Sequence, residues 1–96
     1  MGIGEIIAAK REEILRIAAR HGATNVRVFG SVARGDAGTD SDVDFLVEVG
    51  PVHSRFFPGG LVLDLEELLG RKVDVVEPDG LHPLLQETVL REAVPV

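Results

Sequence analysis

Apolar residues recur along the first part of the chain at the spacing of an α-helix. One face of a helix over residues 5–20 would carry Ile3, Ile7, Ile14, Ile17 and Ala18. The charged residues at positions 10–13 fall largely on the opposite face, so this pattern predicts an amphipathic helix that covers a core. Gly22 is a typical stop signal just beyond such a helix.

Three short apolar segments further along the chain predict β-strands, at residues 25–29, 43–49 and 72–76. The second segment has the strongest alternation. Its inward face would be formed by Val43, Phe45, Val47 and Val49.

Helical segments separate these strands. A single turn is expected at 32–35, and a longer helix that contains Leu61, Leu65, Leu68 and Leu69 ends at Gly70. Pro83 suits the first turn of a last helix running to about Glu92, and Pro95 is expected to end regular structure. The order of elements predicts an α+β fold, in which one domain over residues 1–96 packs helices against a small mixed β-sheet.

Composition narrows the classes of function. The chain has 96 residues, 45% of them hydrophobic, and no cysteine, so disulfides are excluded and a reducing cytoplasm is expected. No apolar stretch approaches the length of about 20 residues that a membrane helix needs, and no signal peptide is expected. The net charge of -6 argues against tight nucleic-acid binding, which depends on Lys and Arg.

Aspartates interrupt two of the apolar strands. Asp42 and Asp44 are two residues apart, so they face the same way, about 6.5 Å from each other along a strand. Asp74 interrupts a separate strand and would complete a site for one or two divalent metal ions, since Mg2+ prefers oxygen ligands. A solvated strand edge or loop is the plainer alternative, although aspartate is depleted in strands. An EF-hand is excluded, because Phe45 and Pro51 stand where its glycine and glutamate belong.

Gly30 and Ser31 form a turn between a strand and a helical turn. The free amides at such a turn attract phosphate groups, and Ser31 could equally be an ordinary helix N-cap. Arg34 is either a surface arginine or a cation that holds a triphosphate.

Together these residues resemble the nucleotidyltransferase superfamily that includes DNA polymerase beta, and most closely its minimal nucleotidyltransferase family. The resemblance rests on the Gly-Ser-Val-Ala-Arg-Gly run at 30–35, the Ser-Asp-Val-Asp run at 41–44 and the Val-Asp-Val strand at 73–75. It covers nearly the whole chain, and the combination is specific where each motif alone would be weak. The resemblance implies the nucleotidyltransferase fold.

The resemblance also implies a reaction, the Mg2+-dependent transfer of a nucleoside monophosphate, AMP from ATP, to an acceptor hydroxyl. Asp42, Asp44 and Asp74 would be the catalytic and metal-binding residues, with two metal sites. Gly30, Ser31 and Arg34 would bind the nucleotide.

The implied acceptor is a partner protein with a HEPN domain, as in toxin–antitoxin pairs. Two alternatives stay open: a non-catalytic antitoxin that acts by contact alone, and a small-molecule enzyme of the antibiotic-modifying type. A homo-oligomer also stays open. Phe56 and Phe57 lie among glycines and prolines in the 50–60 segment and would belong either to the core or to a partner-facing patch.

Overall fold

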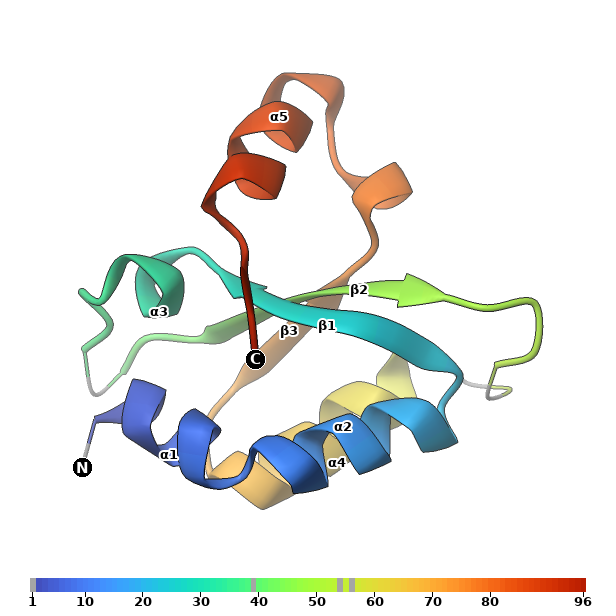
Figure 1. Cartoon of the computed structure of the whole chain (residues 1–96), viewed down its shortest axis with the longest axis horizontal. Helices are drawn as coiled ribbons and strands as arrows, with labels where there is room; N and C mark the ends of the chain where they lie inside the picture. The colour runs from blue at the N-terminus through green and yellow to red at the C-terminus, as the bar shows by residue number, and fades with distance from the viewer. Residues whose placement is uncertain (1, 39, 54, 56) are drawn as a thin grey trace.

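The computed structural model describes residues 2–38, 40–53, 55 and 57–96. It has the predicted α+β architecture, a four-stranded sheet with helices on both faces (Figure 1). In chain order the elements are α1 (Ile3–Ala9), α2 (Arg11–Arg20), β1 (Ala23–Phe29), α3 (Ser31–Arg34), β2 (Val43–Val49), α4 (Gly59–Leu69), β3 (Val73–Val76), the 3-10 turn η1 (Pro78–Gly80), α5 (Pro83–Glu92) and β4 (Val94–Pro95).

The sheet is mixed, with strand order β3-β2-β1-β4. The central strand β2 runs antiparallel to β1 and parallel to β3, and β4 pairs antiparallel with the other side of β1. A parallel neighbour requires a crossover connection, and α4 supplies it between β2 and β3. The N-terminal end of β2 therefore lies between the end of β1 and the start of β3.

The hydrophobic core lies between the sheet and the layer formed by α1, α2 and α4, which covers one face (Figure 1). The alternation predicted for β2 is confirmed, because Val43, Phe45 and Val47 are fully buried in this core. Leu46 points to the opposite face and is also fully buried, on the side where η1 packs against β2. The central strand is thus covered on both faces over this stretch.

Two sequence predictions about chain segments are wrong. The single helix over 5–20 is two helices that meet at Lys10, whose backbone (φ -106°, ψ 17°) lies outside the helical region. The bend leaves the apolar face continuous, since Ile3 and Ile7 of α1 and Ile14 of α2 are all buried in one core.

Pro95 does not end regular structure but forms part of β4, where it pairs with Arg27 of β1. Proline is tolerated there because β4 is an edge strand, in which one side of the backbone needs no partner. The Val96 amide extends this pairing by donating to the Val26 carbonyl at 3.1 Å.

Helix α5 stands away from the sheet on the face opposite α2 and α4 (Figure 1). None of its residues is buried, and the side chains of Leu84 and Leu85 are 83% and 57% exposed. Its base is held by the Gln86 side-chain amide, which donates to the Pro78 carbonyl at 2.9 Å. Among the helices that the structure describes, none is long and apolar enough to span a membrane.

Candidate active site

Asp44 and Asp74 lie side by side on the sheet. They are directly paired in the register of the parallel strands β2 and β3. Val43 and Val73, which precede them, are buried in the core, so alternation turns both aspartates to the opposite face. Asp42 precedes β2 by one residue and is exposed, as is Asp74, whereas Asp44 is half-buried.

The electrostatics of this face centre on Asp44. Burial raises the pKa of its carboxyl, and the negative charges of Asp74 and Asp42 raise it further. Arg34 lowers the Asp44 pKa, and Glu92 at the end of α5 raises it. Four charged side chains from four segments of the chain therefore act on one half-buried carboxylate. A cation bound here would relieve the repulsion among the carboxylates.

Gly30 touches the same carboxylate. Its backbone has φ +71°, a conformation that side chains rarely adopt, and a Cβ at this position would lie 2.6 Å from Asp44 Oδ2. The residue must therefore be glycine for the turn between β1 and α3 to close against Asp44. Ser31 opens α3 at this point, and the first amides of a helix have no partner within the helix.

Arg34, the last residue of α3, is held by two carboxylates. Its Nε donates to Asp36 Oδ2 at 3.2 Å and its Nη1 to Glu92 Oε1 at 3.0 Å. The hydrogen bond and charge of Asp36, with those of Glu92, raise the pKa of the Arg34 guanidinium, which is half exposed. Glu92 was not foreseen from the sequence, because nothing local connects it with a residue 58 positions earlier.

The loop that carries Asp42 is fixed by Arg71, a second residue that the sequence analysis did not single out. Arg71 Nη2 donates to the carbonyl oxygens of Gly38 at 2.7 Å and Ser41 at 2.6 Å. The Ser41 hydroxyl accepts from the Gly38 amide at 2.9 Å, which gives this residue a role in the turn. Only its closeness to Asp74 in the sequence could have pointed to Arg71.

The site thus brings together all six residues predicted from the sequence: Asp42, Asp44, Asp74, Gly30, Ser31 and Arg34. Their donor chemistry suits a hard divalent cation, since three carboxylates face one side of the sheet. In their present rotamers, no three Asp, Glu, His or Cys side chains of the described residues converge closely enough to hold a metal ion. Asp42 and Asp74 are exposed, so their side chains are free of packing that would prevent them from turning toward Asp44.

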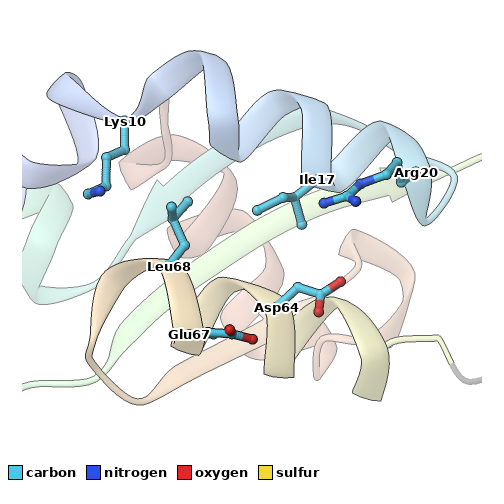
Figure 2. Close-up of a pocket in the computed structure, with 6 residues that line it drawn as sticks. All are labelled: Lys10, Ile17, Arg20, Asp64, Glu67 and Leu68. Atoms are coloured by element: carbon cyan, nitrogen blue, oxygen red, sulfur yellow. The ribbon is translucent and has the colours of Figure 1, made fainter.

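A cavity of about 480 Å3 lies away from the aspartates, between α2 and α4. Figure 2 shows Lys10 and Arg20 on one wall and Asp64 and Glu67 on the other. Near it His21, the residue that follows α2, contacts Asp64 Oδ2 through Nε2 at 2.7 Å. This cavity contains none of the predicted site residues, and its walls belong to the helical layer that covers the core.

The described residues of the 50–60 segment follow the C-terminal end of β2, whereas the aspartates lie at its N-terminal end. Phe57 packs against the buried core, and its ring centre lies 5.8 Å from that of His53. Phe56 lies outside the described residues. For Phe57 the structure therefore favours the core alternative over a fully exposed patch.

Comparison with known proteins gives the family. The nucleotidyltransferase domain family matches residues 11–96, which include every predicted site residue. The chain is a nucleotidyltransferase of this family. The resemblance inferred from the sequence motifs is thereby confirmed.

Two relatives of this nucleotidyltransferase are archaeal. A Methanocaldococcus jannaschii protein named "Putative protein adenylyltransferase" is 41% identical over 96 residues, which cover 100% of this chain and 99% of the relative. Protein adenylyltransferase MntA of Thermococcus cleftensis is 40% identical over 92 residues, which cover 96% of this chain and 90% of the relative.

Solved structures agree on the nucleotidyltransferase fold. One described as a "putative minimal nucleotidyltransferase" is 51% identical, with a TM-score of 0.87 over 100% of this chain and 97% of its own. A toxin–antitoxin crystal structure with AMP-PNP has a TM-score of 0.71 at 22% identity, over 91% of this chain and 69% of its own. At that identity the likeness shows the fold alone.

Proposed function

We propose that this nucleotidyltransferase transfers AMP from ATP to a hydroxyl of a partner protein and releases pyrophosphate. The observation that carries the proposal is the register of Asp44 and Asp74, which sets two carboxylates side by side next to the Gly30 turn. The names of the two archaeal relatives, which both contain the words "protein adenylyltransferase", support AMP as the transferred group.

The three aspartates would hold the metal. Asp42 and Asp44 would bind the Mg2+ that accompanies the triphosphate, and Asp74 would bind a second ion or orient the attacking hydroxyl. When bound, the metal ions would neutralise the negative charge that builds up on the entering and leaving oxygens. The raised pKa of Asp44, caused first by burial and then by the charges of Asp74 and Asp42, supports this assignment, because a bound cation would favour the ionised carboxylate.

The turn between β1 and α3 would hold the leaving part of the nucleotide. The first amides of α3, which follow Gly30 directly, would donate to the β- and γ-phosphates, together with the Ser31 hydroxyl. The Arg34 guanidinium lowers the Asp44 pKa, and its positive charge would attract phosphate oxygens bound beside that carboxylate. Positioning and charge neutralisation account for most of the catalysis in such reactions.

We propose a HEPN-type protein as the partner, in a toxin–antitoxin pair. A protein acceptor agrees with the net charge of -6, which disfavours nucleic acid. It also agrees with α5, which exposes Leu84, Leu85 and Leu90 and whose last residue, Glu92, contacts Arg34 in the site. A partner that covered these leucines would lie close to the reacting groups.

The test is to incubate the protein with ATP, Mg2+ and the protein encoded beside its gene. We expect mass spectrometry to find AMP added to a hydroxyl of that protein, with equimolar pyrophosphate released. GTP, CTP and UTP in parallel reactions measure the nucleotide preference, and Asp44→Asn is the inactive control. Pyrophosphate release without AMP on either chain would contradict a protein acceptor. Transfer to an added aminoglycoside instead would favour the small-molecule alternative.

A further inference from the structure

The side from which the acceptor reaches the site follows from the strand order and rests on the function proposed above. In an in-line displacement the entering oxygen and the leaving pyrophosphate lie on opposite sides of the α-phosphorus. The leaving group would lie at the turn before α3, which follows β1 on one side of β2. The entering oxygen must therefore approach across β2, from the side of β3.

A cleft of about 380 Å3 lies on that side. It is formed by the loop before β2 and the segment before β3, and its lining includes Ser41, Asp42, Gly70, Arg71 and Lys72. Asp42 is thus shared between the cleft and the group of aspartates. Of these cleft residues, Asp42 alone has a role in the proposed nucleotide site, because the phosphates would lie on the β1 side.

Two positively charged side chains line the cleft, and they differ in whether they form hydrogen bonds. The Arg71 guanidinium is used by the carbonyl oxygens of Gly38 and Ser41, so its charge holds the loop. Lys72 is exposed, and among the described side chains it forms neither an ion pair nor a hydrogen bond. The Lys72 ammonium is therefore available to a ligand.

The backbone fixes the direction of Lys72. Its carbonyl accepts from the Val43 amide at 2.9 Å, which ties it to the start of β2. Val73, the next residue, is buried, so Lys72 and Asp74 lie on the same face, about 6.5 Å apart along the strand. A positive charge thus extends the row of acidic residues on the side where the acceptor enters.

We propose that this cleft receives the acceptor residue and that Lys72 is a further catalytic residue that contacts the entering oxygen. The acceptor oxygen forms a bond to the α-phosphorus as the bond between that phosphorus and the bridging oxygen to the β-phosphorus breaks. Pyrophosphate leaves with the electron pair, and the hydroxyl proton passes to water. The Lys72 ammonium stabilises the negative charge on the oxygens around the α-phosphorus during this exchange.

The first test compares Lys72→Ala with the wild-type protein by two measurements. Calorimetry gives the affinity for Mg2+ and a non-hydrolysable ATP analogue, which should stay unchanged. Pyrophosphate release from ATP, with the partner protein or with water as acceptor, should fall by about 10²-fold, the usual loss for one preorganised donor. Lys10→Ala, on the far side of the molecule, is the matched control and should change neither value.

A chemical test separates charge from structure. The chain contains no cysteine, so Lys72→Cys creates a single alkylation site. Treatment with 2-bromoethylamine restores an ammonium at nearly the length of lysine and should recover most of the lost pyrophosphate release. Treatment with iodoacetamide adds a neutral group and should recover none. Equal activity after both treatments would overturn the role of the charge.

The position of the cleft has its own test, which does not depend on turnover. With Mg2+ and the ATP analogue already bound, the rate at which iodoacetamide alkylates Lys72→Cys should fall further when the partner protein is added. Full protection by nucleotide alone would overturn the acceptor assignment. If the wild-type protein releases no pyrophosphate under any condition, the proposed function itself fails. If it does and Lys72→Ala is equally active, only this inference fails.

Discussion

Asp44 of β2 and Asp74 of β3 are directly paired across neighbouring parallel strands. The pairing holds two carboxylates on one face, and the half-buried one has a raised pKa. Like charges on a rigid sheet are unfavourable unless a cation is present. This arrangement therefore lowers the stability of the free protein and raises its affinity for a positively charged ligand.

The pH dependence of stability follows from the raised pKa of Asp44. Its contribution to the free energy of unfolding is fully present below the ordinary pKa of 3.8 and is lost as the pH rises through the raised value. Asp44→Asn removes the carboxyl group and with it this loss of stability, so the variant should melt at a higher temperature than the wild type at neutral pH in EDTA. The difference between the two melting temperatures should shrink as the pH is lowered toward 3.8. Scanning calorimetry at several pH values measures both, and a lower melting temperature of the variant at neutral pH would contradict the unfavourable burial and charge of the Asp44 carboxylate.

If the aspartates bind the metal ion, replacing them should weaken the binding of nucleotide with Mg2+. Asp42→Asn and Asp74→Asn should fold normally, because both side chains are exposed, but should lose Mg2+-dependent nucleotide binding. Calorimetric titration with and without EDTA measures this loss. Glu67→Gln, an acidic-to-amide change on the far side of the molecule, should bind like the wild type. Wild-type affinity in both aspartate variants would exclude the aspartates as metal ligands.

Gly30 and Ser31 should differ in the size of their effects. Gly30→Ala places a Cβ 2.6 Å from Asp44 Oδ2 at a φ of +71°, so strain of about 1–3 kcal/mol is expected together with displacement of the carboxylate. Ser31→Ala removes one hydroxyl contact, worth about 1 kcal/mol. Nucleotide affinity should therefore fall more in Gly30→Ala.

Gly4→Ala is the control for the glycine change. A Cβ there meets nothing within 4 Å, and alanine favours the helix α1. Its melting temperature should be equal to or above that of the wild type. If Ser31→Ala weakens nucleotide binding more than Gly30→Ala, the hydroxyl contact matters more than the close approach of the backbone.

The ion pair between Arg34 and Glu92 should govern the motion of α5. This helix buries none of its residues, so the contact at its last residue is one of few that hold it to the rest of the molecule. Glu92→Gln should speed hydrogen exchange in α5 and leave the β2 amides protected, with little change in global stability. Arg91→Gln, which breaks the pair with Glu87 inside α5, is the comparison variant. Equal exchange in both variants would show that the Arg34 contact does not anchor the helix.

Much of the fold could be predicted because apolar periodicity is strong in this chain. The alternation in β2 and the leucines of α4 each specify one buried face, and both elements formed where expected. The bend at Lys10 could not be predicted, since the spacing from Ile7 to Ile14 fits one continuous helix and no glycine or proline lies between them. β4 was missed because its formation depends on pairing with β1, which no local pattern reports.

In the candidate site, too, some residues could be predicted from the sequence and others could not. The aspartates and the Gly-Ser turn are conspicuous because their residue types conflict with the apolar strands around them. Glu92, Arg71 and Lys72 carry no such signal, because each is an ordinary charged residue in its own segment. Their place beside the aspartates comes from strand order and from contacts across 30 to 58 positions of the sequence.

The crossover that makes β2 and β3 parallel has a consequence for folding. A parallel pair forms only after the loop and helix between its strands have closed, and such non-local pairing is slow. Asp44 and Asp74 therefore come together only after the connection through α4 has closed. A partly folded chain that has β1 and β2 paired would still lack the third carboxylate. Catalytic competence would then appear at the end of folding, so that activity and global folding should be recovered together during refolding.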